Sequence, residues 1–348
     1  MAETALTTTK PGISVVICCY NSAARLPETL RHLQTQENTD GIAWEVVVVD
    51  NASTDSTADT AHQIWAEKPI APLRVVPEPQ PGLSYARARG AAEAAYSIIA
   101  LVDDDNWTPP RWLTTVDRIF KQYPRVGVVG GPTTEVCEVE PPPWFAQFKG
   151  HYAVYGLDSP GGVVEQYVCG AGLCFRKEAW ETVVAKGFEG ELTDRKGKEL
   201  TSGGDTEICA ALRLSGWQIW YEPALCIQHF IPAGRLNWDY LTRLNTGFGK
   251  QSVYLDAYYA LLPGFTRGKP ARPCWIHESL KALRALAGLF PQVGFRSAEQ
   301  LEGSAAWLVW KNQCARLKTL WQEKGGYARR FRRIATAPWN QAGQALHP

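Results

Sequence analysis

The chain has 348 residues and is nearly neutral, with 36 basic and 35 acidic side chains. Hydrophobic residues make up 45% of it and include 14 Trp, 13 Tyr and 11 Phe, which excludes intrinsic disorder as the main state. The balanced charge argues against a generally basic nucleic-acid-binding protein, so we expect no nucleic-acid partner. No apolar run approaches the roughly 20 residues that span a bilayer, and the first residues lack the pattern of a secretory signal.

The nine cysteines are odd in number and form no C-x-x-C pair. Cys18 and Cys19 are adjacent in an apolar run that is typical of a buried strand. Free thiols packed as small hydrophobic groups explain this pattern better than a disulfide framework or a zinc site. Because such thiols persist in a reducing compartment, we expect a cytoplasmic protein.

The first 130 residues alternate between predicted strands and predicted helices. Apolar and β-branched runs predict strands at 13–21, 44–53, 72–78 and 97–107. Apolar residues at helical spacing predict helices at 25–36 and 84–96, and another that begins near Asp55 or Ser56. Repeated strand–helix units of this length predict a doubly wound, mostly parallel α/β sheet.

Beyond residue 130 the pattern is less regular. We expect a loop or edge segment at 131–150, then a strand, a glycine turn and a helix start within 165–180, a mobile polar loop at 191–205, an amphipathic helix at 206–217 and one or two short strands at 218–230. From about residue 235 the chain is predicted to be helical, with one helix near 297–322. We therefore expect an α/β domain over 11–232 and a helical extension with a basic tail over 233–348.

Four carboxylates follow two of the predicted parallel strands. Asp50 ends one strand, and Asp103, Asp104 and Asp105 end another. Ligands of open α/β sheets bind outside the carboxyl ends of the strands. Clustered carboxylates repel one another unless a cation or hydrogen-bond donors lie among them. Asp103 and Asp105 point the same way in an extended segment, so they could bind a divalent ion and a ribose; a solvated acidic turn is the alternative.

Two further candidates lie about a hundred residues later. Asp205 is predicted to lie where a polar loop meets a helix N-terminus, which stabilises an ionised carboxylate. A helix N-cap is the alternative role for this residue. His229 follows a short predicted strand, where it is either a metal ligand or a hydrogen-bonded structural histidine.

Taken together, these segments resemble family-2 glycosyltransferases, which have the GT-A fold. The motifs occur in the family's order: VVICCYN, VVVVDNASTDST, GLSYARARG, LVDDDNWTPPRWL and GGDTEICAALRLSGW, followed by His229. The resemblance extends over about residues 13–230. Each motif is weak alone, but the ordered set makes a chance match unlikely. The resemblance implies a GT-A type α/β sheet followed by a C-terminal helical extension.

The resemblance also implies a donor site. Asp50 would hydrogen-bond the nucleotide base, which could be uracil, thymine or guanine, and Arg87 would contact the nucleotide. Asp103 and Asp105 would form the family's Asp-x-Asp motif. The nucleotide-sugar-binding set implied in this way is Tyr20, Asp50, Ser53, Arg87, Asp103 and Asp104.

A metal ion and a catalytic base are implied in the same way. Asp105 and His229 would bind Mg2+ or Mn2+, and that ion would neutralise the diphosphate as it leaves. Asp205 would be the general base that takes the proton from the acceptor hydroxyl. It would lie across the anomeric carbon from the diphosphate, so transfer would be a single displacement with inversion.

The chain departs from the family pattern at two positions. Ala88 stands where the family usually has asparagine, so one hydrogen bond to the nucleotide is missing or comes from elsewhere, for example Arg89. Gly204 stands where the family usually has glutamate, which often positions the acceptor. The mechanism requires neither the family's asparagine nor its glutamate. Of the two changes, Gly204 is the one that should affect acceptor preference.

Other features admit two interpretations each. Trp107, Trp144, Phe145 and Trp217 could stack on a sugar, although core packing is favoured in a chain with 14 Trp. Gly170 and Gly172 allow a close backbone approach to a ligand or simply form a turn. The loop that holds Arg195, Lys196 and Lys198 could close over phosphates or remain a solvated surface loop.

The basic tail suggests a further partner. Residues 311–333 contain eight basic side chains and one acidic side chain. At ~1 kcal/mol per basic residue near an anionic surface, such a segment could lie on a membrane. A basic helix end with a frayed terminus is the alternative. We therefore expect a cytoplasmic protein that could associate peripherally with the inner face of the cell membrane.

The function implied by the resemblance is transfer of a sugar from a nucleotide-sugar donor to a glycan or lipid-linked acceptor, in the assembly of a surface polysaccharide. A catalytically silent nucleotide-sugar or glycan-binding module on the same scaffold is the alternative. Ala88 and Gly204 keep that alternative open, whereas the retained carboxylates and His229 favour an enzyme. A nucleotidyltransferase is disfavoured, because no glycine-rich phosphate loop follows the first strand.

Overall fold

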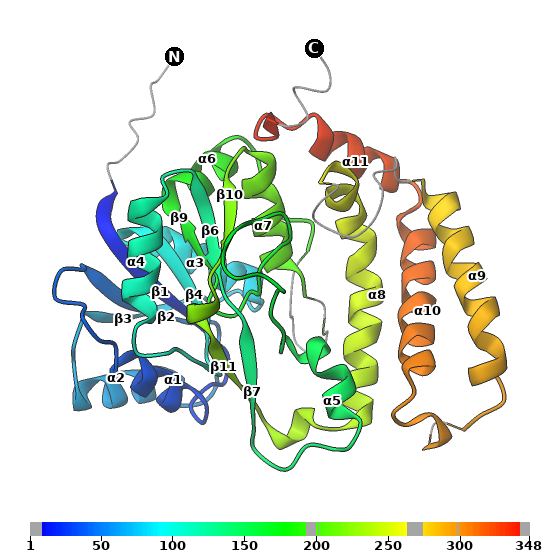
Figure 1. Ribbon diagram of the computed structural model, residues 1–348, viewed down its shortest axis with the longest axis horizontal. Coiled ribbons are helices and arrows are strands. Elements are labelled where there is room, and N and C mark those ends of the chain that lie inside the picture. Colours follow the sequence, from blue (N-terminus) through cyan, green and yellow to red (C-terminus); the bar gives the residue numbers. More distant parts are fainter. Residues whose placement is uncertain (1–8, 193–199, 201, 263–273, 298, 342–348) are drawn as a thin grey trace.

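The computed structural model describes residues 9–192, 200, 202–262, 274–297 and 299–341. Strands and helices alternate over the first 130 residues, as predicted (Figure 1). The elements of this part are β1 (Lys10–Cys19), α1 (Leu26–Leu33), β2 (Trp44–Asp50), α2 (Thr57–Glu67), β3 (Leu73–Pro77), α3 (Leu83–Glu93), β4 (Tyr96–Asp103), β5 (Asn106–Trp107), α4 (Trp112–Gln122) and β6 (Val126–Gly130).

The middle of the chain is built from shorter elements. They are β7 (Thr133–Cys137), α5 (Phe145–Phe148), the 3-10 helix η1 (Lys149–Tyr152), β8 (Gly162–Val164), β9 (Cys174–Arg176), α6 (Lys177–Ala185), α7 (Gly204–Leu214), β10 (Gln218–Tyr221), η2 (Pro223–Leu225), β11 (Ile227–Ile231) and η3 (Ala233–Arg235). The prediction of one or two short strands at 218–230 is confirmed, since β10 and β11 lie there.

An eight-stranded sheet, in the order β3-β2-β1-β4-β9-β6-β10-β8, forms the centre of the fold. β1 pairs in parallel with both β2 and β4, and the pairs β2–β3 and β6–β10 are also parallel. β9 runs antiparallel to its two neighbours, and β8 runs antiparallel to β10. The predicted α/β class with a mostly parallel sheet is confirmed.

Helices cover both faces of this sheet, as a doubly wound fold requires. On one face α1, α2 and α4 pack against β1 and β2, and the first of these helices contributes Leu26, Leu30 and Leu33. On the other face α3, α6 and α7 pack through smaller side chains, among them Ala86, Ala91 and Ala179. β2 is buried along six of its seven residues, because it is covered from both sides.

Three short strands form a second sheet in the order β5-β11-β7. β11 pairs in parallel with β7 and antiparallel with β5, so that His229 lies opposite Asn106. This pairing joins the acidic turn after β4 to a segment more than 120 residues further along the chain. The pairing brings His229 beside the acidic turn, where the site described below lies.

Three expectations need correction or refinement. The 131–150 segment, predicted as a loop or edge, contains β7, α5 and the start of η1. Within 165–180 the strand is β9, which follows the glycine turn and does not precede it. The helix α7 is buried on nearly all sides and is not amphipathic, because α8 and the buried Trp339 pack over the surface that would face solvent.

The C-terminal region is helical, as predicted. It contains α8 (Trp238–Leu261), α9 (Trp275–Val293), the short η4 (Glu299–Leu301), α10 (Ala305–Glu323) and α11 (Tyr327–Ala335). The helix expected near 297–322 corresponds to α10. Figure 1 shows α8 next to the α/β part, α10 beside it and α9 outermost. In the parts of the chain that the structure covers, no helix is long and apolar enough to cross a membrane.

Candidate functional site

A cavity of about 460 Å³ opens at the carboxyl edge of the large sheet. Of the predicted site residues, those that line it are Tyr20, Arg87, Asp103, Asp104, Asp105, Asp205 and His229. Asp50 and Ser53 lie outside its lining. The Asp50 carboxylate accepts a hydrogen bond from the backbone N–H of Ser53 at 3.2 Å, and the Ser53 hydroxyl accepts one from the N–H of Asn21 at 3.0 Å.

Asn51, the neighbour of Asp50, does line the cavity, although sequence reasoning did not single it out. Its side-chain amide donates to the carbonyls of Glu78 and Gln80 at 3.1 and 2.7 Å and accepts from the N–H of Gly82 at 2.8 Å. These bonds hold the segment that leads into α3, the helix that carries Arg87. The VVVVDNASTDST motif, which contains Asn51, was the sequence signal that could have identified this residue.

Asp104 anchors the acidic turn to α1. Its carboxylate is buried and accepts from the Arg25 guanidinium at 2.6 Å. The Thr29 hydroxyl donates to the Asp104 carbonyl at 2.9 Å. Burial and the neighbouring Asp105 carboxylate raise the pKa of Asp104, and Arg25 opposes that shift. Arg25, which sequence reasoning missed, therefore balances part of the negative charge of the turn.

Asp105 and His229 meet through the pairing of β5 with β11. The backbone N–H of Phe230 donates to the Asp105 carbonyl at 2.8 Å, and the carboxylate Oδ1 lies 3.6 Å from Nε2 of His229. The other ring nitrogen, Nδ1, lies 2.8 Å from the carbonyl oxygen of Tyr152. Since that carbonyl can only accept, Nδ1 carries the proton, and in the neutral ring the Nε2 lone pair faces Asp105.

Arg235 completes this cluster. It lies on η3, directly after β11, and its Nη1 donates to the Asp105 Oδ2 at 2.9 Å. Burial lowers the pKa of Arg235, but the carboxylates of Asp105 and Asp104 outweigh that effect and raise it. Arg235 was also missed, because only the β5–β11 pairing brings it beside a carboxylate 130 positions away.

The cluster fits a metal ion that is held by two side chains and a substrate. The described residues include no group of three or more His, Cys, Asp or Glu side chains placed to hold a metal. Asp105 and His229 nevertheless offer one carboxylate oxygen and one oriented imidazole nitrogen. Two ligands at about 2.1 Å from one ion lie roughly 3 Å apart, close to the observed 3.6 Å. Such a site leaves positions for phosphate oxygens, a common arrangement for Mg2+.

Asp205 lies in the first turn of α7, with Gly203 rather than Asp205 as the N-cap residue. Its carboxylate borders the cavity and accepts from the N–H of Thr206 at 2.9 Å. Gly170 leaves the space that this carboxylate occupies, because a Cβ atom there would lie 2.5 Å from Oδ2 of Asp205. The glycine turn at 170–172 therefore makes room for an acidic side chain.

Tyr155 and Tyr167 line the cavity near Asp205. Burial, together with Asp205 and neighbouring titratable groups, raises the pKa of both phenols. They therefore remain protonated and able to donate hydrogen bonds. Cys169 is buried in the same region, where desolvation raises the pKa of its thiol to about 12.

The cavity has two walls of different chemistry. We call the first the strand wall; it consists of Tyr20, Asn51, Asp103, Asp104 and Asp105 at the ends of strands. We call the second the helical wall; it consists of His151, Tyr152, Tyr240, Leu244 and Phe248 from η1 and α8. In the helical wall, the rings of His151 and Phe248 lie 5.9 Å apart and those of Tyr152 and Tyr240 lie 6.0 Å apart.

The four aromatic residues considered for sugar stacking all lie outside the cavity lining. Trp107 is stacked between His32 and Phe230, at 5.3 and 5.6 Å between ring centres. Trp144 packs on Trp238, and Phe145 is buried. Core packing, the favoured interpretation, therefore accounts for these three. The residues Arg195, Lys196 and Lys198 lie outside the described part of the chain.

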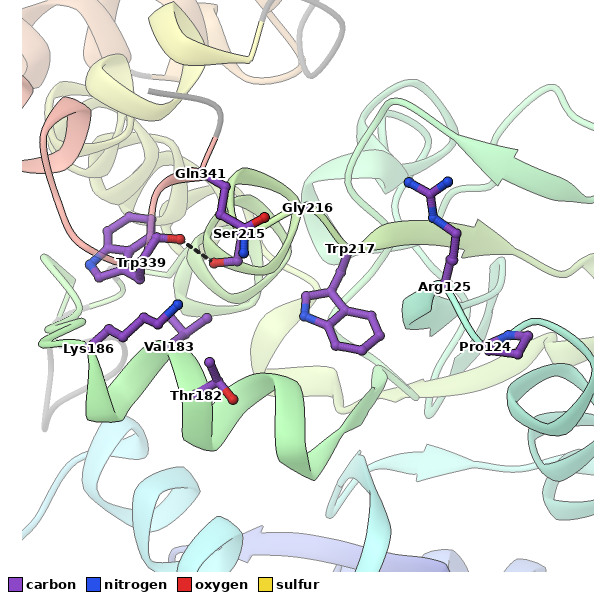
Figure 2. Close-up of a pocket in the computed structure, with 10 residues that line it drawn as sticks. All are labelled: Pro124, Arg125, Thr182, Val183, Lys186, Ser215, Gly216, Trp217, Trp339 and Gln341. Carbon is purple, nitrogen blue, oxygen red and sulfur yellow. Dashed lines mark hydrogen bonds between the residues drawn. The ribbon is translucent and has the colours of Figure 1, made fainter. Parts of the chain in front are cut away.

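Trp217 lines a separate hollow of about 360 Å³ (Figure 2). Arg125, Lys186 and Trp339 also contribute to it, and the Ser215 hydroxyl donates to the Trp339 carbonyl at 2.8 Å. None of the predicted site residues borders this hollow. The candidate chemistry is therefore confined to the cavity at the strand ends.

Comparison with known proteins gives a family and a fold. Residues 14–182 match the family described as "Glycosyl transferase family 2". A glucosyl-dolichyl phosphate glucuronosyltransferase from Haloferax volcanii is 23% identical over 51% of this chain and 57% of its own length. A dolichol-phosphate mannosyltransferase from Pyrococcus furiosus is 33% identical over 28% of this chain and 27% of its own. The chain thus spans little more than half of the first relative and about a quarter of the second.

Two solved structures share the fold. The mannosyltransferase PcManGT from Pyrobaculum calidifontis, in complex with GDP-Man and Mn2+, superposes with a TM-score of 0.56 and 19% identity over 92% of this chain and 88% of its own. Residues 1–349 of TarS from S. aureus, in complex with UDP, superpose with a TM-score of 0.50 and 15% identity over 90% and 92%. At these identities the likeness concerns the fold alone.

Proposed function

Because residues 14–182 make this chain a member of glycosyl transferase family 2, we propose that it is an inverting, metal-dependent glycosyltransferase. The donor would be a nucleoside-diphosphate sugar, and the acceptor a glycan or a lipid-linked sugar. One observation carries the proposal: a single cavity gathers the acidic turn after β4, His229 on β11 and Asp205 at the start of α7. The chain brings these groups together from three separate segments.

The strand wall would bind the donor. Tyr20, Arg87, Asp103 and Asp104 border the cavity, whereas Asp50 and Ser53 lie outside its lining. Asp105 and His229 would hold Mg2+ or Mn2+, which would stabilise the negative charge that develops on the departing diphosphate. Arg235 already lies against Asp105, so its guanidinium adds a second positive charge on the same side of the cavity.

Asp205 would act as the general base. Its carboxylate accepts the proton of the acceptor hydroxyl while that oxygen forms a bond to the anomeric carbon. The bond from the anomeric carbon to the diphosphate oxygen breaks in the same step, and the nucleoside diphosphate leaves from the opposite face. The carboxylate lies in the first turn of α7, at the border of the cavity. Gly170 keeps the space around the carboxylate open.

The acceptor would contact the helical wall. Rings of Tyr240, Phe248 and His151 offer apolar faces of the kind that pack on sugars. The names of the two relatives given above refer to lipid phosphates, which supports a lipid-linked acceptor and, with it, a role in surface glycan assembly. All nine cysteines are free thiols, which supports the cytoplasm as the location.

The first test compares Asp205→Asn with a matched control. Asp59→Asn makes the same chemical change in the first turn of α2, where the side chain is exposed and remote from the cavity. Calorimetric titration with UDP, GDP and dTDP, with and without Mn2+, identifies the donor nucleotide, and transfer is then assayed with the matching nucleotide sugars. Loss of a general base typically costs about 10²–10⁴-fold in rate.

We expect Asp205→Asn to lose about 10²–10⁴-fold in transfer rate while it still binds the nucleotide. Asp59→Asn should retain both transfer and nucleotide binding. Full transfer by Asp205→Asn with an intact fold would contradict the assignment of the base. Metal-dependent nucleotide binding without transfer by the wild type to any glycan or lipid-linked acceptor would favour a catalytically silent binding module.

A further inference from the structure

The outer face of α9 carries an uncovered apolar stripe. Ile276, Leu280, Leu283 and Phe290 are 51%, 45%, 47% and 45% exposed, and the exposed Ala287 continues the series. Spacings of four and three residues place these side chains on one side of a helix. A different side of α9, with Ser279, Ala282 and Val293, is buried in the packing with α10. The helix therefore has two apolar sides, and only one is covered.

The stripe continues onto α10. Trp310, Cys314, Leu317 and Trp321 recur at the same spacing along that helix, and each remains at least partly accessible. The Trp310 ring lies 6.3 Å from that of Phe290, and the Trp321 ring lies 5.7 Å from that of Trp275. These contacts, at opposite ends of two antiparallel helices, join the two stripes into one surface, which we call the α9–α10 face. Figure 1 shows α9 and α10 on the side of the molecule opposite β3.

Aromatic side chains are exposed at both ends of this face. Trp321 is 55% exposed at one end, and Phe295 is 92% exposed at the other, 5.4 Å from the Phe290 ring. Soluble monomers rarely expose a continuous apolar surface of this kind without a partner. Aromatic rings at the margins of an apolar surface are typical of the boundary between lipid and water.

The charges around the face are more positive than negative. Residues 274–323 contain six basic side chains and four acidic ones, Glu278, Glu299, Glu302 and Glu323. Glu302 accepts from the Trp144 indole at 3.0 Å, and Glu323 is paired with Arg330 at 2.7 Å. The Glu278 carboxylate is paired with Arg316 at 2.8 Å and with Lys281 at 2.7 Å. Arg284, Arg296 and Lys318 are exposed cations beside the apolar stripes. A partner for this face should therefore be apolar in the middle and negatively charged around it.

We propose that the α9–α10 face binds peripherally to an anionic lipid bilayer. The apolar stripe would lie among the acyl chains near the surface, and the cations would contact the headgroups. A second copy of the chain fits less well, because it would bring two sets of the same exposed cations together. The proposal goes beyond sugar transfer, since it concerns a surface that shares no residue with the cavity lining.

This placement differs from the membrane contact expected of 311–333 as a basic tail. Arg316, Arg330 and Arg333 of that segment are engaged in ion pairs with Asp256, Glu191 or Glu323. Tyr327 is buried and Phe331 packs against the core, so the apolar side of α11 faces the protein. Within 311–333, the part that belongs to the proposed surface is the C-terminal half of α10, which carries Lys318 and Trp321.

Vesicle flotation tests the proposal with the whole chain and needs no transfer activity. The probes are vesicles of phosphatidylcholine alone and vesicles that also contain phosphatidylglycerol. The double variant Leu280→Gln/Leu283→Gln removes the centre of the stripe, and Arg284→Gln/Lys318→Gln removes two of the cations. Val184→Gln is the control, because Val184 is 46% exposed on α6, outside the face.

We expect wild type and Val184→Gln to float with the anionic vesicles and to remain largely unbound with phosphatidylcholine. The leucine variant should lose about tenfold or more in partitioning, and the charge variant should lose its response to phosphatidylglycerol. Because the altered side chains are exposed, circular dichroism and the melting temperature should be unchanged.

Three results would overturn the proposal. One is absence of binding to anionic vesicles, and another is equal flotation of wild type and the leucine variant. The third is a dimer, seen by sedimentation of the lipid-free protein, that the leucine variant abolishes; the face would then be an interface between two copies.

Discussion

The two walls of the cavity are held in place by different forces. Charged groups fix the strand wall, where Asp104 pairs with Arg25 and Asp105 with Arg235. Ring packing holds the helical wall, where Tyr240 and Phe248 contact η1. Ion pairs and strand ends fix atoms to within a narrow range, as binding of a diphosphate requires. Stacked rings tolerate adjustment, which suits acceptors of varied shape.

If this contrast is correct, substitutions in the two walls should have different consequences. Changes in the strand wall should affect both folding and donor binding, since its charges are buried. Changes in the helical wall should mainly affect the acceptor.

The largest effect should follow from Asp105→Ala. Asp105 is 5% exposed and its partner Arg235 is 20% exposed, so the variant leaves a buried arginine without its carboxylate. We expect a loss of about 3 kcal/mol in the free energy of unfolding in urea. Asp239→Ala breaks a pair with Arg243 in which the side chains are 80% and 54% exposed, and should cost less than about 1 kcal/mol. Equal losses in the two variants would contradict a strand wall held by charge.

Gly170→Ala should have the next largest effect. The added methyl group would lie 2.5 Å from the Asp205 carboxylate and would displace it. A shift of that kind typically reduces kcat by about 100-fold. Gly150→Ala is the matched control, because Gly150 also lines the cavity but has nothing within 4 Å of an added Cβ. Nucleotide affinity, measured by calorimetry, should be retained in both variants; a similar loss of kcat in both would show that the space around Asp205 is not critical.

Phe248→Ala tests the helical wall and should have a smaller effect. Loss of one stacking ring is worth about 1 kcal/mol, which corresponds to roughly a fivefold higher KM for the acceptor. The dissociation constant of the donor nucleotide should not change. Leu83→Ala, in the cavity lining at the start of α3, is the comparison on the donor side. If Phe248→Ala raised the acceptor KM and the dissociation constant of the donor nucleotide by the same factor, donor and acceptor would not bind to separate walls.

The same contrast explains what the sequence could predict. Asp103, Asp105 and Asp205 follow local signals, namely the end of an apolar strand and the start of a helix. Arg235 has no local signal, because its contact with Asp105 depends on the pairing of β5 with β11. Gly170 was noted as a site of a turn or of a close backbone approach, but its packing against Asp205 depends on two residues that are 35 positions apart. Nonlocal packing of this kind does not appear in residue periodicity.

Two errors in the predicted elements have the same origin. The spacing of apolar residues in α7 indicated an amphipathic helix, but α8 also covers its other side, and even Glu207 is buried there. β9 has only three residues, too few for an alternating pattern to identify it, and it is defined by its pairing with β4 and β6. The helical wall was not predicted either, because the sequence indicated only that the chain is helical from about residue 235 and not that this helix lines the cavity.

The smallest predicted effect concerns pH and the helical wall. Burial lowers the pKa of His151 below its ordinary value, although the Phe148 carbonyl and Asn245 oppose the shift. As the pH falls below about 6.5, the unfolded chain takes up this proton more readily than the folded one. The contribution of His151 to stability is therefore complete above that pH and is lost progressively below it.

His151→Gln should remove this part of the pH dependence. The urea midpoint of the wild type should fall more than that of the variant between about pH 7.5 and about pH 5.5, a range that brackets the ordinary histidine value. The carboxylates of the strand wall also titrate at low pH, but they are the same in both proteins and cancel in the comparison. If the urea midpoints of the two proteins changed with pH in parallel, the helical wall would admit enough water to hold a charged His151. The contrast between the two walls would then be weaker than the packing indicates.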